Sequence, residues 1–399
     1  MDRHPPGASG RLGSGVTTNS LEPGAPQRCT QLLRTSSRVG LGGRLAVVVA
    51  AIVLLAACSG AQPEASSSSS SSSTETTPTT QPVASTTTTT AAPLVAWSGP
   101  VEHLFFHTLV IRPDLAFVQG SAGDGFRDYF VTVGEFRAIL DQLYANGWTL
   151  VDIHRAVKGE VRVPAGRKPF VLSEDDVNYY DYSRTRGVGW RLVLGDAGAV
   201  KVEVRDDQGT RLTDDDVVPI VDAFVAAHPD FSADGAKGII AMTGYEGLFG
   251  ERVNDTESPD WAAAEARAKA VADRLRATGW LFASHSYGHN QLDHQSVAAL
   301  QRDAERWSAE ALPIIGPTDI YIFPFGAAPI PGSAKANLLR DEGFAIQCDI
   351  GPTARLVHAG GVDIMSRRHI DGIAFRDGVA RLAPLFDVAK VEDVAARST

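Results

Sequence analysis

From Trp97 onward, hydrophobic and polar positions follow two alternating patterns along the chain. Short apolar runs, typical of buried strands, are followed by longer segments in which apolar residues recur every three or four positions, as on one face of a helix. The runs that predict strands are VEHLFFHTLV, WTLVDIH, KPFVLSEDD, GAKGIIAMTG, WLFASHSYGH, DIYIFPFG and FAIQCDI. This repeated strand–helix order predicts a parallel sheet with right-handed crossovers.

Local signals mark two of the helices and one inserted segment. Thr132 and Glu135 form the Thr-x-x-Glu pattern of a capping box, which predicts a helix that ends before Gly147. An Ala- and Arg-rich segment at 259–277 predicts a long helix. Two alternating runs around a Gly-rich turn at 190–206 predict a β-hairpin inserted among the strand–helix units.

The number of strand–helix units indicates the architecture. Six or seven units over about 300 residues fit an α/β fold built as a closed or nearly closed (β/α) barrel. In such barrels the chemistry lies at the carboxyl ends of the strands. Polar clusters follow three of the predicted strands, at 173–176, 285–289 and 324–326, and these clusters are therefore the candidate site.

The N-terminal segment follows neither pattern. Arg38 and Arg44 precede the apolar run LAVVVAAIVLL at 45–55, which is too short to span a bilayer comfortably. Basic residues, a short apolar segment and a small-residue cleavage site are typical of a secretory signal. The cysteine directly after Leu-Ala-Ala resembles the bacterial lipobox, which implies that Cys58 becomes the lipidated first residue. An uncleaved short anchor with an incidental cysteine is the alternative.

A Ser/Thr-rich stretch at 59–93 follows, with almost no apolar content, and it predicts a disordered tether. The predicted organisation is a signal peptide at 1–58, a tether at 59–93 and a (β/α) barrel domain at 94–399. A lipid-anchored protein of this kind is expected at the extracytoplasmic face of the bacterial cell membrane.

Composition and charge restrict the possible partners. The 399 residues are 44% hydrophobic and 21% charged, which is ordinary for a globular protein. Removal of residues 1–57 takes away six arginines and two acids, and lowers the formal net charge from −10 to −14. Without a basic stripe we expect no nucleic acid partner, and we expect a monomer. Cys348 is the one cysteine after Cys58, so the mature domain has no pair for an internal disulfide.

The segment SHSYGH places His285 and His289 four residues apart. On one turn of a helix such a pair lies on the same face and can reach one metal ion. Many surface helices carry such a pair by chance, so the spacing alone leaves both a metal clamp and a polar surface turn open. A third ligand elsewhere in the chain would favour the metal.

Taken in chain order, the strand end 172–176, the segment HSYGH and the segment FPFG resemble the motifs of the polysaccharide deacetylase family. This family is also called the NodB-homology domain or carbohydrate esterase family 4. Its members carry a strand ending in a T-F-D-D-type motif, then H-S/T-x-x-H, then a loop of the R-x-P-F/Y type. The resemblance covers roughly residues 101–375 and implies a distorted or seven-stranded (β/α) barrel.

By this resemblance, Asp176, His285 and His289 bind a divalent metal and Asp175 is the general base. One carboxylate and two imidazoles suit Zn²⁺ best, and Co²⁺ or Ni²⁺ would fit the same ligands. Adjacent side chains of a regular strand diverge, so Asp175 and Asp176 can serve one site only if the strand bends at its end. The alternative is an acidic loop with solvated charges.

The sequence also departs from the family pattern. Val177 stands where the family has glycine, and Ile322 stands where it has the arginine of the third motif. The resemblance gives the backbone N–H of Phe325 a role in holding the oxyanion. The late motif that supplies the general acid is not evident, and His369 and His358 are the candidates for that role, with a structural role for His369 as the alternative.

Other residues are candidates for contact with the substrate. Tyr179, Tyr180, Tyr182 and Tyr287 would form a stacking wall for sugar rings, although aromatic residues near a cleft are as often part of the packing, and Pro324 is a further candidate for contact with the substrate. His107 resembles the first-strand histidine of relatives, and it would either line the site or be a hydrogen-bonded core residue.

Together these observations predict a metal-dependent hydrolase that removes acetyl groups from an extracytoplasmic glycan. A catalytically inactive glycan-binding lipoprotein on the same scaffold is the first alternative, favoured by the missing arginine and the unidentified acid. A metallohydrolase of another amide or ester is the second, because a fold does not fix its substrate.

Overall fold

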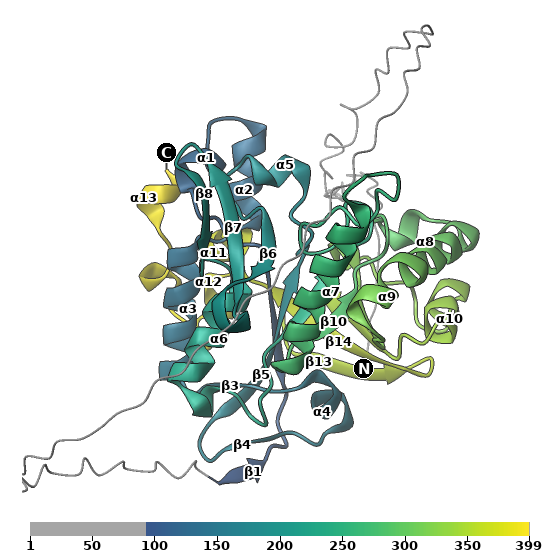
Figure 1. The fold of residues 1–399 in the computed structure, drawn as a ribbon. Helices are drawn as coiled ribbons and strands as arrows, with labels where there is room; N and C mark the ends of the chain where they lie inside the picture. The colour runs from purple at the N-terminus through teal and green to yellow at the C-terminus, as the bar shows by residue number, and fades with distance from the viewer. Residues whose placement is uncertain (1–92, 399) are drawn as a thin grey trace, which may run out of the picture. The chain divides into compact units, whose positions relative to one another are not determined.

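The computed structural model describes residues 93–398, whose centre is a closed parallel β-barrel surrounded by helices (Figure 1). Seven strands are hydrogen-bonded side by side in parallel, and β14 pairs with both β12 and β2, which closes the ring. In their order around the barrel the strands are β2 (Glu102–His107), β5 (Lys168–Asp175), β9 (Ile239–Met242), β10 (Leu281–Ser284), β11 (Ile320–Ile322), β12 (Ile346–Ile350) and β14 (Val362–His369). The predicted seven-stranded (β/α) barrel is confirmed.

Shorter strands extend the barrel or lie outside it. β3 (Trp148–Leu150) pairs with β5, and β13 (Arg355–Ala359) pairs antiparallel with β14. β1 (Leu94–Ala96) and β4 (Arg162–Pro164) form a separate two-stranded sheet. The predicted inserted hairpin is present and continues into a third antiparallel strand, so that the insertion consists of β6 (Arg191–Leu194), β7 (Val200–Asp206) and β8 (Gly209–Thr213).

Helices follow the barrel strands and cover the outer surface of the barrel. The capping box of α3 is formed as predicted, with the Thr132 hydroxyl accepting from the Glu135 backbone and the Glu135 carboxylate accepting from the Thr132 backbone. The helices are α1 (Pro113–Ala116), α2 (Ser121–Tyr129), α3 (Val133–Ala145), α4 (Ile153–Lys158), α5 (Asp181–Arg184), α6 (Val217–Ala227), α7 (Trp261–Ala277), α8 (Val297–Glu310), α9 (Leu312–Ile315), α10 (Ala334–Asp341), α11 (Gly372–Asp377), α12 (Val379–Leu382) and α13 (Val394–Arg397).

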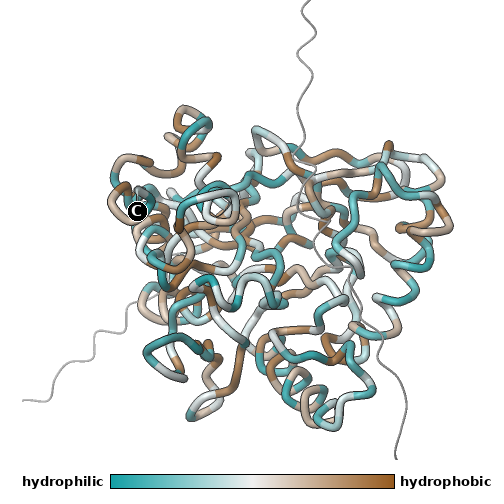
Figure 2. The backbone as a smooth tube through the Cα atoms, turned by 90° about the horizontal axis from the view of Figure 1, so that it is seen from above, coloured by the Kyte–Doolittle hydropathy of each residue, from teal (hydrophilic) through white to brown (hydrophobic). Residues whose placement is uncertain are grey.

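The core has two layers, one inside the barrel and one between the barrel and its helices. Small and branched side chains fill the barrel interior, among them Val171, Ala241, Ala283, Ile322 and Cys348. Larger aromatic and aliphatic side chains fill the outer layer. Hydrophilic and hydrophobic stretches alternate along the outer helices in Figure 2, as expected for helices with one buried face.

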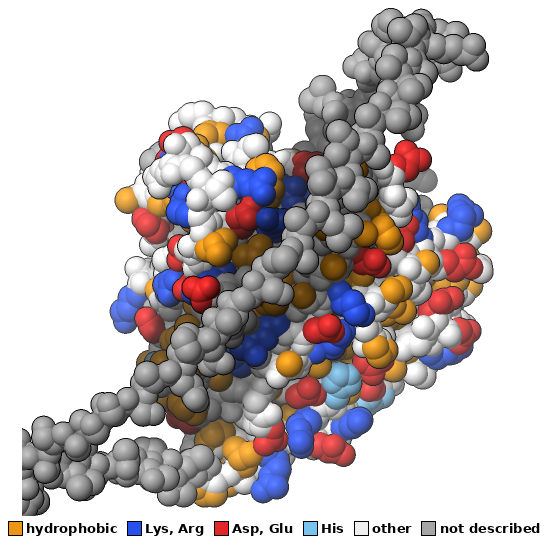
Figure 3. Space-filling view, viewed as in Figure 1, with side chains coloured by type: hydrophobic (Ala, Val, Ile, Leu, Met, Phe, Trp, Pro, Cys, Tyr) orange, Lys and Arg blue, Asp and Glu red, His pale blue; other side chains and the backbone are white. Residues whose placement is uncertain are grey.

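The predicted signal peptide, the lipidation site Cys58 and the predicted tether lie outside the described residues. Within residues 93–398, no helix is long and apolar enough to cross a membrane. On the face shown in Figure 3, acidic and basic side chains are intermixed.

Candidate active site

The carboxyl ends of β5 and β10 and the loop after β11 bring the three predicted motifs together at one end of the barrel. β5 ends at Asp175, and Asp176 has a φ of 63°, which is left-handed and breaks the strand. This bend turns both carboxylates toward the same space, as their shared role requires. Left-handed backbone is uncommon for residues other than glycine and clusters at functional sites.

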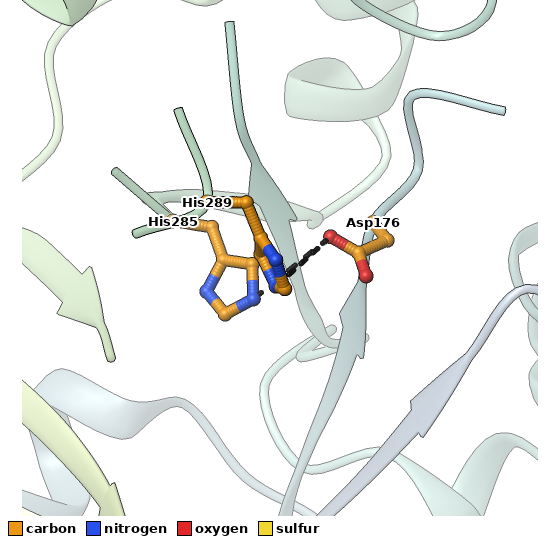
Figure 4. Close-up of side chains that lie close together, drawn as sticks. All are labelled: Asp176, His285 and His289. Carbon is orange, nitrogen blue, oxygen red and sulfur yellow. Dashed lines mark ion pairs between the residues drawn. The ribbon is translucent and has the colours of Figure 1, made fainter. Parts of the chain in front are cut away.

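Three side chains at this end form a set of metal-ligand donors (Figure 4). The ligand atoms of Asp176, His285 and His289 all lie within 4.8 Å of one another. Oδ1 of Asp176 lies 3.9 Å from Nε2 of His285 and 3.8 Å from Nε2 of His289. Metal–ligand bonds of about 2.1 Å place neighbouring donor atoms roughly 3–4 Å apart, so these residues fit a divalent ion.

The His285 imidazole is fixed in the tautomer that a metal ligand needs. Its Nδ1–H donates to the carbonyl of Ile322, at 2.8 Å, which leaves the lone pair of Nε2 on the side of Asp176. Burial lowers the pKa of His285 to about 4, so the ring is neutral at physiological pH. Burial opposes ionisation of Asp176, yet the two histidines outweigh it and lower the pKa of that carboxyl.

The Asp175 carboxylate is held by an arginine from the last strand of the barrel. Nη1 of Arg367, on β14, lies 2.7 Å from Oδ1 and 2.9 Å from Oδ2 of Asp175, and both side chains are buried. Burial by itself would raise the pKa of Asp175, but the charge and hydrogen bonds of Arg367, together with His285, lower it to about 2. Asp175 is therefore ionised, as a general base must be.

A layer of polar side chains beneath Asp175 holds this arginine in the barrel. Nη1 of Arg367 also donates to the hydroxyl of Ser173, at 3.2 Å, and Nε2 of His103 lies 3.0 Å from the same hydroxyl. The guanidinium lies 4.1 Å from the centre of the Phe105 ring, which adds a cation–π contact. The position that the sequence assigns to the family's arginine, Ile322, is buried in the barrel.

The Asp176 carboxylate has a second partner besides the histidines. The Tyr180 hydroxyl donates to Oδ1 of Asp176, at 2.8 Å, and also lies 2.8 Å from the hydroxyl of Thr243, which follows β9. The Tyr180 ring is stacked between the rings of Tyr182 and Tyr245, with centroid distances of 5.8 and 5.0 Å. Tyr180 thus supports the candidate metal ligand, and the exposed Tyr182 presents aromatic surface beside it.

An acid on helix α8 fixes the loop that carries both histidines. The Asp303 carboxylate accepts from the backbone N–H groups of Tyr287, at 2.7 Å, and Gly288, at 2.9 Å. It also accepts from the Asn290 side chain, at 2.9 Å. In this loop Ser286 and His289 have left-handed φ values of 59° and 50°. Asp303 therefore stabilises a backbone conformation that is otherwise unfavourable.

The loop after β11 contributes Pro324 and Phe325. Phe325 has a left-handed φ of 59° within the short 3₁₀ turn Pro324–Gly326, and its side chain is 61% exposed. Its ring lies beside the His289 ring, with 4.6 Å between the centroids. Pro324 is buried, so it shapes the loop and leaves the exposed surface here to Phe325.

Two histidines stand at the barrel mouth on neighbouring strands. His107, at the end of β2, lies opposite Asp175 in the β2–β5 register and donates Nδ1–H to the Tyr129 carbonyl at 2.9 Å. His369, at the end of β14, pairs instead with Asp371 at 2.9 Å. His107 is thus the histidine on the strand next to the two carboxylates of the site.

Several residues that the sequence places near the site face elsewhere. Tyr179 is buried and donates its hydroxyl to Asp216, at 2.6 Å, so it cannot stack on a sugar. The Tyr287 ring is also buried, with its hydroxyl on Glu310 at 2.7 Å. The second candidate acid, His358, lies exposed on β13 and pairs with Asp363.

Comparisons with known proteins add similarities in backbone only. No protein-family model matches the chain, and no curated protein matches it. The chain is similar to the Streptococcus pyogenes deacetylase PplD in complex with acetate, at 11% identity and a TM-score of 0.41, over 69% of this chain and 93% of that one.

Two further solved structures are similar to a comparable extent. A de-N-acetylase from Aggregatibacter actinomycetemcomitans has 13% identity and a TM-score of 0.44, over 72% of this chain and 100% of that one. IcaB from Ammonifex degensii has 13% identity and a TM-score of 0.41, over 71% of this chain and 97% of that one. At these values the likeness carries no argument about function, which therefore rests on the site itself.

Proposed function

We propose that this protein is a metal-dependent deacetylase that removes acetyl groups, most simply N-acetyl groups, from an extracytoplasmic glycan. The observation that carries the proposal is that two carboxylates with different partners lie at one site. Asp176 lies with His285 and His289 as a set of metal donors, whereas Asp175 is held by Arg367 next to that set. This division suits the hydrolysis of an amide by an activated water.

The residues of the chain have separate tasks in this reaction. A divalent cation, most simply Zn²⁺, supplies Lewis acidity that polarises the acetyl carbonyl and makes water easier to deprotonate. Asp175 takes the proton of the attacking water, and Arg367 keeps its carboxylate ionised and oriented. The backbone N–H of Phe325 stabilises the negative charge that develops on the acetyl carbonyl oxygen when water adds to its carbon.

The proton for the leaving amine comes from one of the two histidines at the barrel mouth. His107 is the stronger candidate, because it lies opposite Asp175 on the neighbouring strand, and the Tyr129 carbonyl fixes Nδ1–H so that Nε2 remains for proton transfer. His369, the candidate from the sequence, is instead bonded to Asp371 at the start of α11.

Two features of the sequence had favoured a glycan-binding protein without chemistry, namely the missing arginine and the missing acid. Arg367 offers the first from another strand, and His107 offers the second. The hydrolase is therefore the better proposal. Hydrolysis of a different amide or ester on the same barrel remains the competing reaction, and a panel of substrates separates the two.

The test is acetate release from acetylated glycans by the purified, metal-loaded protein and two variants. Asp176→Asn should lose bound metal and activity together. Asp175→Asn should keep its metal while turnover falls by about 10²–10⁴-fold, the usual scale for a positioned acid–base group. Circular dichroism must accompany both, because Asp175→Asn leaves the Arg367 charge buried. No acetate from the wild-type protein on any glycan would reject the proposal.

The site of action is proposed from the N-terminal sequence. The Leu-Ala-Ala-Cys58 motif supports lipid attachment at Cys58 and an extracytoplasmic, membrane-anchored enzyme. Metabolic labelling with a fatty acid should mark the wild-type protein and not Cys58→Ala. An unlabelled wild-type protein would remove the anchor from the proposal and leave the chemistry untouched.

A further inference from the structure

A cavity of about 260 Å³ opens beside the barrel mouth, where β12 and β14 end and helices α11 and α12 begin. At about 30 Å³ for each water molecule, this volume holds roughly nine waters, which is enough for a sugar ring or a substituent on one. Residues that line the cavity include Ile350, Pro352, Arg368, His369, Arg381 and Leu382.

The ionisable groups of this lining are all basic. Arg368 is already neutralised, because its Nε lies 2.8 Å from Oε2 of Glu102. Arg381 is exposed at the rim, and within residues 93–398 no acidic side chain forms an ion pair with it. Arg381 therefore gives a positive charge to a cavity with no acid among its lining residues, and this charge attracts a negative group.

His369 gives the cavity a directed polar group. Its Nδ1 lies 2.9 Å from Oδ2 of Asp371, and a carboxylate in this position accepts Nδ1–H. Asp371 is itself fixed, since its Oδ1 accepts from the backbone N–H of Ala374 at 2.8 Å. The ring is therefore held by Nδ1–H and keeps the lone pair of Nε2 to accept from a ligand hydroxyl, while Ile350 and Leu382 give apolar surface beside it.

The cavity is also close to the reaction centre along the strand. His369 follows Arg367 by two residues on β14, so both side chains lie on the same face of that strand, roughly 7 Å apart. Arg367 in turn holds Asp175. A substituent of the acetylated sugar, or of its neighbour, would span this distance.

We propose that this cavity binds a carboxylate of the glycan, held by Arg381, while Nε2 of His369 accepts from a neighbouring sugar hydroxyl, so that the preferred substrate is an acidic acetylated glycan. The inference rests on the proposed deacetylase function and adds the class of substrate. One unpaired guanidinium matches a single negative charge, which favours a carboxylate over a doubly charged phosphate.

The test compares binding of matched acidic and neutral oligosaccharides to the metal-loaded protein by titration calorimetry. One acidic probe is a hyaluronan tetrasaccharide, whose carboxylates lie on uronate rings, and the other is a muramic acid disaccharide, whose carboxylate lies on a lactyl ether. Each is paired with its carboxyl-reduced form. Acetate is assayed in the same samples, so that loss of the subsite and loss of hydrolysis are read separately.

The wild-type protein should bind at least one acidic probe about five- to tenfold more tightly than its reduced form, as for one charge-assisted hydrogen bond. Added salt should shrink this preference. Arg381→Gln should abolish it, whereas the matched control Arg376→Gln should not, because Arg376 pairs with Asp128 and Asp377 outside the cavity.

Equal binding of acidic and reduced probes, or no binding of either acidic probe, would overturn the proposal, and so would a preference that persists in Arg381→Gln. If acetate is released in those cases, the deacetylase function stands and the subsite alone is rejected. His369→Gln should weaken binding of the acidic and the reduced probe alike and leave the preference between them, since it alters an acceptor for a sugar hydroxyl and keeps the charge of Arg381.

Discussion

Arg367 on β14 and Asp175 on β5 form a fully buried ion pair. These two strands flank β2 on either side, so the pair joins strands that are not adjacent in the barrel. One nitrogen of the guanidinium lies within 2.9 Å of both carboxylate oxygens. Neither residue could be relocated without leaving the other charge uncompensated inside the barrel. The proposed base and its orienting group are therefore a single unit of the core.

Arg367→Met should destabilise the protein by about 3–5 kcal/mol, the usual cost of leaving one member of a buried pair unpaired. The pKa of Asp175 should then rise, since burial is no longer opposed, and the acid limb of the pH–rate profile should move to higher pH. Urea unfolding and a pH–rate profile measure the two effects. Arg355→Gln, which breaks an exposed pair with Asp349, is the control and should change neither.

His107→Gln should lower kcat by about 10²–10⁴-fold, because the proton for the leaving amine is lost. His369→Gln should leave kcat on a neutral acetylated glycan within about threefold, if its role lies in the neighbouring cavity. Metal content should stay unchanged in both variants. The reverse result, with activity lost only in His369→Gln, would return the role of general acid to His369.

Asp303→Ala should weaken metal binding by about 10–100-fold, the scale seen when a partner of the ligands is removed. The reason is that the loop of His285 and His289 loses three hydrogen bonds from one carboxylate. Competition with a chelator measures the affinity. Glu305→Gln on the same helix, where Glu305 accepts only from Gln301, should bind metal as the wild type does.

A pH dependence of stability is expected at the opposite end of the barrel. His154 lies between Asp152 and Asp319, and its hydrogen bonds to these two carboxylates raise its pKa to about 9. Because the folded pKa exceeds the usual value of about 6.5, the stabilisation is complete below that pH and is lost as pH rises through about 9.

The size of this effect is about 1 kcal/mol once screening of the partly exposed His154 side chain is allowed for. Urea unfolding of the wild-type protein should show the free energy of unfolding falling by this amount between about pH 6.5 and 9. In His154→Gln the fall should be absent. An equal fall in both proteins would assign it to other groups.

The barrel and the candidate metal donors could be predicted from the sequence because each depends on local patterns. Period-2 and period-3.6 hydrophobicity predicts the order of strands and helices, and HSYGH with the paired acids predicts the donors that the structure brings together. Strand geometry also predicted a bend at the end of the strand that carries Asp175 and Asp176. The left-handed backbone of Asp176 is this bend.

The parts of the candidate site that could not be predicted from the sequence depend on contacts between distant segments. Arg367 is 192 residues from Asp175, and Asp303 reaches back from a helix to the preceding loop. No strand was expected over 362–369, so the shared face of Arg367 and His369 on β14 became apparent only in the structure. Tyr179 was misplaced because the chain turns at Asp176, so that alternation along a strand no longer tells which way a side chain points.

The position of β14 in the chain has a consequence for biosynthesis. Every candidate metal donor and the proposed base lie on earlier segments, but the strand that closes the ring and holds Asp175 is the last barrel strand to emerge from the ribosome. Until that strand inserts between β12 and β2, Asp175 has no counter-charge. A nascent or C-terminally clipped chain is therefore expected to be inert, so activity would begin only in fully delivered molecules.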